Sequence, residues 1–571
     1  MERKSILNLV IIFMFSALMV CLLNLGILQG ARFRRLSDSN SIRLISQFGC
    51  RGNILDRHGE LIVGNKVSYD VSILPQDLDN IDQVLALIGS ILNVEAKELR
   101  MEFKKNFFSS SMPVIVARNI KLKEAILIGE HKAEQPSIIV TAKPLRYYPY
   151  KSLAAHLVGY VNEIDRWRLT KLEDYGYKTK DIVGFGGVEE KFDYYLRQEE
   201  GGLSVEVNHR GKIMRVLGFQ PPRNGKDLML TLDLSIQKIV EDNLNGRKGS
   251  IILMDPLSGE ILALASFPNF NPAIFVDQRS KLISGLFNDA NAPFLNRAIG
   301  SSYPLASVFK IVVASAGLEL KRINLSTSFV CQGSTLVGSR RFKCWDVHGA
   351  VDIFQAIARS CDVFFYKIGL SLGAQNIHDY ALKLGLGKNV GFELAGETSG
   401  FIPSPLWRKM NKFQNWFDGD TANLSIGQGD CLVTPLQATN MLAVFANHGY
   451  LLSPYIVKAV GGLDFSVKKK RFIRVPFKKS TFEVVTQGLG KVVSDPQGTG
   501  NVLSTLPIKV AGKTGTAQVS RGATHAWFVG FFPLDKPKYV ICVFLENGGP
   551  GHFASVVAKQ IIEAMINQGL I

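Results

Sequence analysis

The sequence lacks a second long apolar stretch, a recognisable nucleic-acid-binding motif and any internal repeat. It has only seven cysteines in 571 residues, an odd number without the compact spacing of a disulfide framework. Acidic residues number 49 against 66 basic ones, so the net charge is +17. That charge suits an anionic partner such as phospholipid headgroups or an acidic cell-wall polymer. Because the basic residues are scattered, we expect no nucleic-acid function. The 46% hydrophobic content, with one long apolar stretch, excludes a disordered chain and a polytopic membrane protein.

The one long apolar segment determines the topology. Residues 6–28 contain no charged side chain, and at ~1.5 Å rise per residue this length of helix spans the hydrocarbon core of a bilayer. It exceeds the apolar region of a cleavable signal, and no small-x-small cleavage site follows, so we interpret it as an uncleaved single-pass anchor. Arg3 and Lys4 precede it and three arginines follow it, so the positive-inside rule leaves the orientation open.

Hydrophobic patterning divides the chain into three parts, with expected domains at 1–28, 29–225 and 226–571. The middle part has short alternating strands separated by turns, and apolar spacing that predicts a helix over 83–105. Residues 219–225 have the composition of a linker. The last part predicts a sheet packed by helices, hence a mixed α/β (α+β) fold. Its expected strands are 250–255, 261–266, 526–532 and 539–546, and its expected helices include 307–320 and 554–568.

Three short motifs occur in one order along the chain: Ser307-x-x-Lys310, Ser360-x-Asp362 and Lys513-Thr514-Gly515-Thr516. Each is weak alone, and S-x-x-K also occurs at Ser235 and Ser466, where we regard it as chance. Ser307 differs because it opens an apolar helix. Positions i and i+3 of a helix share a face, so Lys310 can reach the serine hydroxyl and, when desolvated, act as its base.

The ordered set resembles the signature of penicillin-binding proteins and serine β-lactamases. Flanking segments extend the resemblance, specifically to class B penicillin-binding proteins, over nearly the whole chain: 51–57, 146–159, 254–260, 296–298, 427–429 and 434–437. Asp362 in place of the commoner asparagine, and Cys344-Trp345 with His348-Gly349, are similar to the elongation branch of that class. Ala306 stands where the family has glycine, a change that we expect the turn to tolerate.

The resemblance implies a serine-type peptidoglycan D,D-transpeptidase of the D-Ala-D-Ala carboxypeptidase class, inhibited by β-lactams and acting in cell elongation and shape maintenance. It implies an anchor, an elongated β-rich pedestal or dimerisation-like domain, and a transpeptidase domain whose central antiparallel sheet is packed by helices. Ser307 would attack the penultimate D-Ala carbonyl and Lys310 would accept its proton. Ser360 and Asp362 would continue the proton and hydrogen-bond network.

The third motif would bind the substrate. By the resemblance, Lys513 supplies positive charge on an edge strand, and the Thr514 and Thr516 hydroxyls hold the terminal carboxylate. Gly515 would allow a close approach to the substrate backbone. The oxyanion would lie between the backbone N–H groups of Ser307 and Thr516.

The resemblance also implies where the protein acts and with what. We expect a bacterial inner-membrane protein with the bulk of the chain in the periplasm. Its expected partners are peptidoglycan stem peptides, β-lactams, a polytopic SEDS glycosyltransferase and other elongation-complex proteins. The acyl transfer needs no cofactor.

Other functions share parts of this signature. A division-type class B enzyme, a β-lactam sensor or a β-lactamase would use the same acylation machinery. A class A β-lactamase needs a deacylating glutamate after the second motif, whereas the E-x-x-L-N match at 241–245 precedes Ser307. A bifunctional class A enzyme would need an E-D-x-x-F glycosyltransferase motif, which is absent. Scaffolding would be additional to catalysis, because all the catalytic positions are intact.

Four residues predict a structural zinc site: Cys331, Cys344, His348 and Cys361. Their spacing, C-x12-C-x3-H-x12-C, provides three thiolates and one imidazole, a common tetrahedral set. Relatives in the elongation branch resemble this pattern, with a metal site next to the S-x-D motif. Two alternatives stay open, namely a disulfide between Cys331 and Cys344 in an oxidising compartment, and buried thiols.

Overall fold

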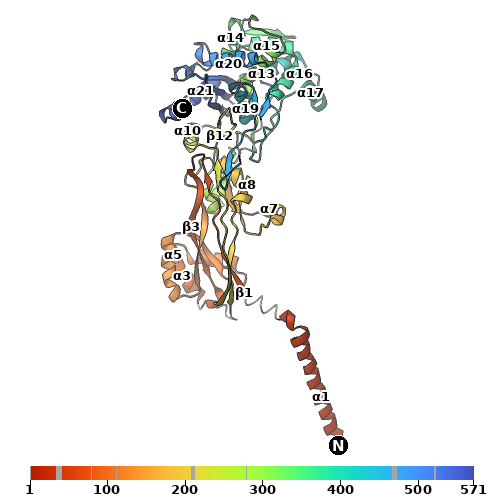
Figure 1. The fold of residues 1–571 in the computed structure, drawn as a ribbon, viewed down its shortest axis with the longest axis vertical. Helices are drawn as coiled ribbons and strands as arrows, with labels where there is room; N and C mark the ends of the chain where they lie inside the picture. The colour runs from red at the N-terminus through yellow and green to blue at the C-terminus, as the bar shows by residue number, and fades with distance from the viewer. Residues whose placement is uncertain are drawn as a thin grey trace. The chain divides into compact units, whose positions relative to one another are not determined.

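The computed structural model describes residues 2–33, 42–78, 80–110, 112–207, 213–277, 280–465, 472–519 and 522–571 (Figure 1). The chain forms two compact units that are not contiguous in sequence. Unit 1 comprises residues 1–51, 65–145 and 197–225, and unit 2 comprises 52–64, 146–196 and 226–571. Each unit is described by itself below.

The N-terminal helix α1 (Glu2–Leu23) continues into a short π-helical turn, η1 (Asn24–Leu28). Within it, Ile6–Leu28 is the one helical stretch of the described residues that is long and apolar enough to cross a membrane, with a mean hydropathy of 2.8. No part of it is buried against the rest of the chain. This length of exposed apolar side chains is typical of a single-pass membrane anchor, in agreement with the sequence.

Unit 1 is a mixture of strands and short helices around its own apolar core. Its strands are β1 (Ile42–Gln47), β3 (Leu61–Ile73, which begins in unit 2), β4 (Val114–Ile120), β5 (Ile138–Tyr147), β8 (Gly201–Val207) and β9 (Ile213–Gln220). Its further helical elements are η2 (Pro75–Asp77), α3 (Ile81–Leu92), α4 (Ala96–Asn106), α5 (Leu122–Glu130) and η3 (His131–Ala133). Strands β1, β8 and β9 form an antiparallel sheet, and β3 pairs with β4 and β5.

The single helix expected over 83–105 is wrong, because the structure has two helices there. Asn93 takes a left-handed conformation (φ 55°) and ends α3, and α4 begins at Ala96. Asparagine is one of the few residues that adopt this conformation readily. The apolar spacing is nevertheless real, since Val84 and Ile88 of α3 and Leu99 and Phe103 of α4 share one core.

The first part of unit 2 consists of short elements. They are β2 (Ile54–Leu55), α6 (Ala155–Val158), β6 (Tyr160–Glu163), α7 (Arg166–Leu172), η4 (Glu173–Tyr175), β7 (Ile182–Phe185), α8 (Gly187–Lys191), α9 (Asp193–Leu196) and β10 (Leu228–Leu230). The buried Asp56 holds the turn after β2 by accepting from the backbone N–H groups of His58 and Glu60. Arg57 pairs with Glu260 at 3.1 Å. Both contacts organise the backbone, as expected for a structural turn.

The largest sheet of unit 2 is antiparallel and five-stranded, in the order β12–β11–β23–β22–β21. Its strands are β11 (Gly249–Met254), β12 (Ile261–Phe267), β21 (Ala511–Ala517), β22 (His525–Phe532) and β23 (Tyr539–Leu545). The four strands predicted from sequence match β11, β12, β22 and β23. Every residue of β11 and β22 is buried, which explains why these strands are apolar without alternation.

Helices cover both faces of this sheet (Figure 1). Ile251 and Leu253 point into a core shared with α10 (Leu234–Leu244) and α21 (Gly551–Asn567). Ile252 and Met254 point into the opposite core. Among the helices of that second core are α13 (Lys310–Glu319), α14 (Ile353–Ala358), α15 (Asp362–Leu372), α16 (Ala374–Lys383), α19 (Pro435–Ala446) and α20 (Lys479–Ser494). The helix predicted over 554–568 is α21, which begins three residues earlier.

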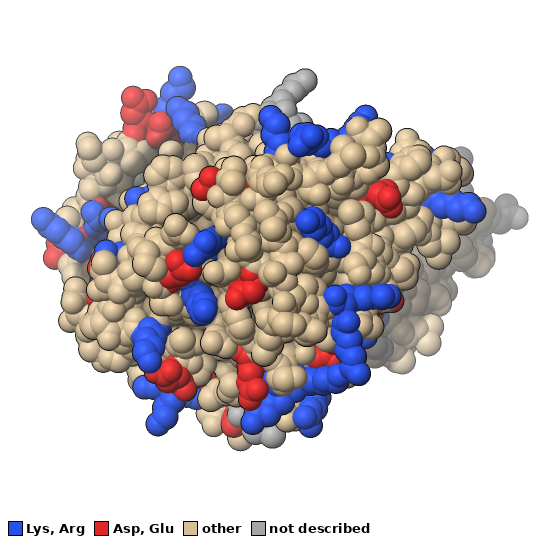
Figure 2. All heavy atoms as spheres, turned by 90° about the horizontal axis from the view of Figure 1, so that it is seen from above, with Lys and Arg blue, Asp and Glu red and all other residues tan. Residues whose placement is uncertain are grey.

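The remaining elements of unit 2 are short. The strands are β13 (Phe329–Cys331), β14 (Ser334–Val337), β15 (Arg340–Lys343), β16 (Gly349–Val351), β17 (Tyr450–Leu452), β18 (Val457–Val460), β19 (Leu463–Asp464) and β20 (Phe472–Arg474). The helical elements are α11 (Ala273–Val276), α12 (Ser280–Phe287), η5 (Ala306–Phe309), α17 (Pro405–Lys412), α18 (Asp418–Ser425) and η7 (Asn501–Thr505). On the face drawn in Figure 2, basic and acidic side chains are interspersed over a mostly uncharged surface, as expected from their scatter in sequence.

Candidate active site

The turn that carries Ser307 lies between a loop and a buried helix. The helix predicted over 307–320 consists of the 3₁₀ turn η5 followed by α13, of which all but the last two residues are buried. Ala306 has a left-handed φ of 52°, a conformation that costs a non-glycine residue about 1–2 kcal/mol. Its N–H donates to the carbonyl of Gly427, where an added Cβ would lie 2.4 Å from the Ala306 oxygen. The surrounding chain therefore fixes the turn.

Lys310 is almost completely buried, with 1% of its side chain exposed. Its ammonium donates to the Ser360 carbonyl at 2.8 Å, to the Ser360 hydroxyl at 3.1 Å and to Asp362 Oδ1 at 2.6 Å. Three acceptors thus replace the water that an ammonium would otherwise bind. Among the described contacts, none is a hydrogen bond of the Ser307 hydroxyl, although Ser307 and Lys310 share one face of the turn.

Ser360 is itself held in an unusual conformation. Its φ is 56°, and it immediately precedes Cys361, the N-cap residue of α15, which begins at Asp362. The indole N–H of Trp345 donates to the Ser360 carbonyl at 3.2 Å and to the Arg359 carbonyl at 3.0 Å. This indole therefore keeps the Ser360 carbonyl oriented in a turn whose backbone is strained.

The third motif lies on β21, at the edge of the five-stranded sheet, as predicted. A Cβ at Gly515 would lie 3.1 Å from the Leu305 carbonyl and 3.2 Å from Val308 Cγ2, so the glycine allows the strand to approach the Ser307 turn. From the sequence, we expected Gly515 to allow a close approach of the strand to the substrate backbone. The Thr516 hydroxyl accepts from the Gly551 N–H at 2.9 Å, which leaves its own O–H available to a ligand.

Lys513 is fully buried, and its ammonium donates to the Thr514 carbonyl at 3.2 Å. Burial lowers the pKa of Lys513 well below the ordinary value, the positive charge of Lys310 lowers it further, and Asp362 partly opposes both. The site thus contains a cation with little compensation beneath the strand that is predicted to bind a carboxylate.

The predicted residues meet at one cleft of about 680 Å³. Ser307, Ser360, Asp362, Thr514 and Thr516 line it directly. Lys310 and Lys513 lie beneath its surface, bonded to residues that line it. The combination of a serine, a buried ammonium network and threonine hydroxyls on an edge strand can activate a hydroxyl and bind an anionic acyl substrate.

Sequence reasoning missed Thr499, which also lines the cleft. The Thr514 hydroxyl donates to Thr499 Oγ1 at 2.6 Å, and the Thr499 N–H donates to the Ala358 carbonyl at 3.1 Å. Thr499 therefore links the third motif to the segment that precedes the second motif. Its position in Gly498-Thr499-Gly500, a polar residue between two glycines, was the available signal.

The competing motif matches lie elsewhere. Ser235 is at the start of α10, and its partner Lys238 lies over the ring of Tyr150 at 4.6 Å. Glu241, also on α10, accepts from the Ala154 N–H at 2.5 Å, and burial raises its pKa to about 7. It is not among the residues that line the cleft. Ser466 and Lys469 lie outside the described residues.

The four predicted metal ligands form one cluster. The ligand atoms of Cys331, Cys344, His348 and Cys361 all lie within 4.8 Å of one another. His348 Nδ1 is 3.6 Å from Cys331 Sγ and 3.5 Å from Cys344 Sγ. A tetrahedral ion with Zn–S of ~2.3 Å and Zn–N of ~2.0 Å would separate sulfur and nitrogen by about 3.5 Å. All seven cysteines are free, so the structure has no Cys331–Cys344 disulfide.

This cluster contacts the catalytic network directly. The Asp362 N–H donates to Cys344 Sγ at 3.2 Å, and Cys361 is the N-cap residue of α15, which opens with Asp362. The hydrogen bond with Cys361 holds the pKa of Cys344 well below its ordinary value and raises that of Cys361. A sulfur that carries negative charge accepts the Asp362 N–H more strongly.

Comparison with known proteins gives the class. Residues 249–567 match the penicillin binding protein transpeptidase domain, and residues 47–230 match the penicillin-binding protein dimerisation domain. The chain therefore belongs to the penicillin-binding proteins, in the class B group that combines these two domains.

Within this class the chain is similar to the elongation enzymes. It is 32% identical to the peptidoglycan D,D-transpeptidase MrdA of Acinetobacter baumannii, over 98% of this chain and 88% of that protein. It is 30% identical to MrdA of Escherichia coli K12, over 98% and 93%. Penicillin-binding protein 2 of Helicobacter pylori, solved in complex with MreC, is 28% identical and has a TM-score of 0.81, covering 93% of this chain and 99% of that one.

Lys513→Met is expected to raise stability while lowering the rate of penicillin acylation. Because the folded pKa of Lys513 is depressed, the unfolded chain binds more protons between that pKa and about 10.4, so stability rises with pH across this window. The free-energy cost of burying the Lys513 charge is present in full at pH values below the folded pKa, and it disappears near pH 10. At pH 6.5 the melting temperature of Lys513→Met should therefore exceed that of the wild type, by roughly 2–4 °C for each kcal/mol of burial cost removed. At pH 10 the two melting temperatures should be equal.

Lys509→Met is the matched control, because the Lys509 side chain is 73% exposed and should change neither property. Without the Lys513 charge, acylation should fall by about 30-fold or more. A lower melting temperature for Lys513→Met than for the wild type at pH 6.5 would contradict the conclusion that the buried Lys513 charge is poorly compensated.

Thr499→Val should slow penicillin acylation about tenfold, because the hydroxyl that fixes Thr514 is replaced by a methyl group of the same size. Thr499→Ser should restore most of the rate. Thr505→Val, a surface threonine on η7, is the control. An unchanged rate in Thr499→Val, measured by stopped-flow with a fluorescent penicillin, would remove Thr499 from the site.

Proposed function

We propose that this protein is the peptidoglycan D,D-transpeptidase of cell elongation, acting through an acyl-enzyme on Ser307. The observation that carries the proposal is the buried Lys310 ammonium, bonded to Ser360 and Asp362 beneath a cleft that Ser307 also lines. The matches to both domains and to MrdA over nearly the whole chain support it.

Acylation begins with the substrate peptide across the cleft. The Ser307 oxygen attacks the carbonyl carbon of the penultimate D-Ala, and the Ser307 proton passes to the network of Lys310 and Ser360. For Lys310 to accept that proton, its amine must itself be neutral at that step. As the peptide bond breaks, a proton returns to the departing D-Ala nitrogen through Ser360.

Binding of the terminal carboxylate orients the peptide. We assign it to the Thr514 and Thr516 hydroxyls above the positive charge of Lys513, with the Thr514 O–H turning from Thr499 Oγ1 to the carboxylate when the peptide binds. The oxyanion of the tetrahedral intermediate would accept from the N–H groups of Ser307 and Thr516. In the second half-reaction the amine of a neighbouring stem peptide attacks the acyl carbonyl carbon, and the ester bond to Ser307 breaks. The proton lost by the amine returns through the same network to the Ser307 oxygen.

The anchor and the substrate define the location. We propose that Ile6–Leu28 crosses the bacterial inner membrane once and that the rest of the chain is periplasmic, where stem peptides are found. MreC accompanies penicillin-binding protein 2 in the H. pylori structure. A solved peptidoglycan synthase complex covers 99% of this chain at 29% identity. Elongation-complex proteins, including a polytopic SEDS glycosyltransferase, are accordingly the proposed partners.

Penicillin should acylate the full-length protein at Ser307, and Ser307→Ala should not be labelled. Lys310→Ala and Lys310→Arg should both lose about 10²–10⁴-fold in acylation rate, since arginine keeps the charge but cannot accept the proton. Mass spectrometry of the peptide adduct locates the acylated residue. Labelling at Ser235 or Ser466, or a wild-type acylation rate in Lys310→Arg, would contradict the assignment of Ser307 as nucleophile and Lys310 as base.

We further propose that Cys331, Cys344, His348 and Cys361 hold a structural zinc ion. The argument is the sulfur–nitrogen separations of 3.5 and 3.6 Å and the convergence of four ligand atoms, which suit a tetrahedral site with four protein ligands. The ion would brace the segment that bears Ser360 and Asp362 and would take no part in acyl transfer.

Elemental analysis of the protein purified without chelators should give about one zinc per chain. Cys361→Ser should lower both the zinc content and the acylation rate, whereas Cys431→Ser, a buried cysteine outside the cluster, should alter neither. Less than about 0.2 zinc per chain, together with a Cys331–Cys344 disulfide found by peptide mapping, would exclude the site.

A further inference from the structure

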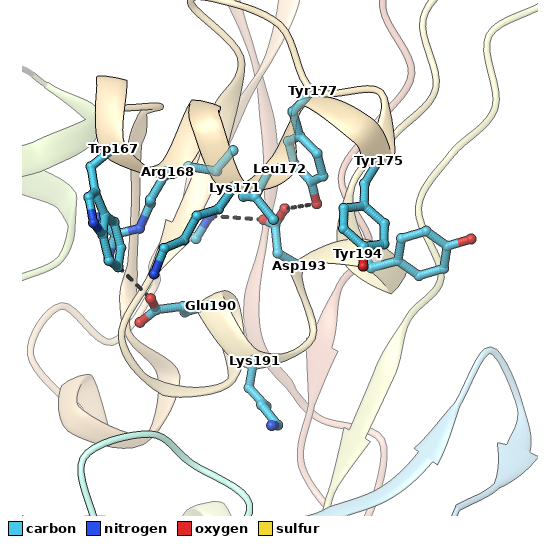
Figure 3. Close-up of a pocket in the computed structure, with 12 residues that line it drawn as sticks. Trp167, Arg168, Lys171, Leu172, Tyr175, Tyr177, Glu190, Lys191, Asp193 and Tyr194 are labelled. Carbon is cyan, nitrogen blue, oxygen red and sulfur yellow. Dashed lines mark hydrogen bonds and ion pairs between the residues drawn. The ribbon is translucent and has the colours of Figure 1, made fainter.

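A second pocket, of about 540 Å³, lies in unit 2 and shares no lining residue with the catalytic cleft (Figure 3). It is built by α7, η4, β7, α8 and α9, all between residues 160 and 196. Its volume is in the usual range for small-molecule sites. The proposed reaction does not use it.

The floor and one wall of this pocket are fixed without a ligand. The buried Asp193 accepts from the Tyr177 hydroxyl at 2.5 Å and from the Gly184 N–H at 2.8 Å. Arg168 bonds Asp165 at 2.6 Å and Glu190 at 3.1 Å, and its guanidinium lies 3.8 Å from the centre of the Phe185 ring. These charge-assisted contacts give the pocket a preformed shape.

The rim has a different character, because it exposes large aromatic rings. Trp167, Tyr175 and Tyr194 are 64%, 63% and 66% exposed. In Figure 3, Trp167 lies on one side of the labelled group and the two tyrosines on the other, with Lys171 between them. Single exposed aromatics are ordinary, but three that surround one hollow indicate a ligand.

Two lysines complete the rim. The Lys171 ammonium lies 3.7 Å from the centre of the Trp167 ring, and Lys191 follows on α8. Neither has an ion-pair partner among the described contacts of this pocket, so their N–H donors are available. The lining thus combines aromatic rings and hydrogen-bond donors with the polar Tyr177–Asp193 pair.

The combination of exposed aromatic rings and hydrogen-bond donors fits a carbohydrate. A pyranose ring presents C–H groups on its faces, which stack on tryptophan and tyrosine, and hydroxyl and acetamido groups at its edges, which accept from lysine and tyrosine. A lipid chain would leave the Tyr177–Asp193 floor facing hydrocarbon, which is unfavourable. A saccharide satisfies both kinds of surface at once.

We infer that this pocket binds the glycan backbone of peptidoglycan, a polymer of N-acetylated amino sugars, apart from the cleft that acts on the stem peptide. The inference rests on the proposed function, since it concerns the polymer to which those peptides are attached. Binding the glycan would retain the strand near the enzyme while the acyl-enzyme waits for an acceptor, and the second contact raises the effective concentration of the first.

The test uses the full-length protein in detergent micelles, with Ser307 acylated by penicillin to close the cleft. Calorimetry measures binding of a β-1,4-linked N-acetylglucosamine tetramer and of peptide-free glycan strands released by an amidase. Binding should survive acylation. Trp167→Ala and Tyr194→Ala should each weaken it about tenfold or more, the effect of losing a main aromatic contact. Phe413→Ala is the matched control, an 88% exposed ring outside the pocket.

Three results would overturn the inference: no binding of either glycan, binding lost on acylation, or equal affinity in Trp167→Ala and wild type. A protein captured at the pocket by photo-crosslinking from Tyr194, with no glycan binding, would also overturn it. Penicillin acylation of each variant is measured in the same preparation. Normal acylation without glycan binding rejects this inference alone, whereas failure of the wild type to acylate at Ser307 rejects the proposed function.

Discussion

The catalytic region depends on how one buried ammonium is satisfied. Lys310 is inside an apolar helix, and its three acceptors come from only two residues, Ser360 and Asp362. An unpaired ammonium in this position would cost several kcal/mol, so the second motif has to lie where it does. That requirement explains the left-handed turn at Ser360, the Trp345 hydrogen bond to its carbonyl and the start of α15 at Asp362.

The second buried lysine, Lys513, has much less compensation for its charge than Lys310. Burial depresses the pKa of Lys513, the positive charge of Lys310 depresses it further, and the Asp362 carboxylate offsets them only in part. In the proposed reaction a substrate carboxylate would supply counter-charge to Lys513, and part of the binding energy would then come from compensating this buried charge. Stability and substrate affinity are therefore opposed at this residue.

Sequence was sufficient for features that depend on local order and pattern. The three motifs, the membrane-spanning length and four strands of the main sheet are of this kind, because spacing and apolar runs encode them directly. The break at Asn93 was missed because one left-handed residue interrupts a continuous apolar pattern. Thr499 was missed because its bonds to Thr514 and Ala358 join segments 15 and 141 residues away. The closeness of Gly515 to the Leu305 carbonyl was not predicted, because the two residues are far apart in sequence.

The contact between Gly427 and the Ser307 turn has a consequence for how this enzyme can evolve under β-lactams. Ala306 already holds a left-handed backbone, and any side chain at position 427 would lie against its carbonyl. Gly515 closes the other side in the same way. Substitutions at the base of the cleft therefore disturb the nucleophile that the natural substrate also needs. Selection for drug resistance would then act on other residues that line the cleft, such as Gln518 and Thr524.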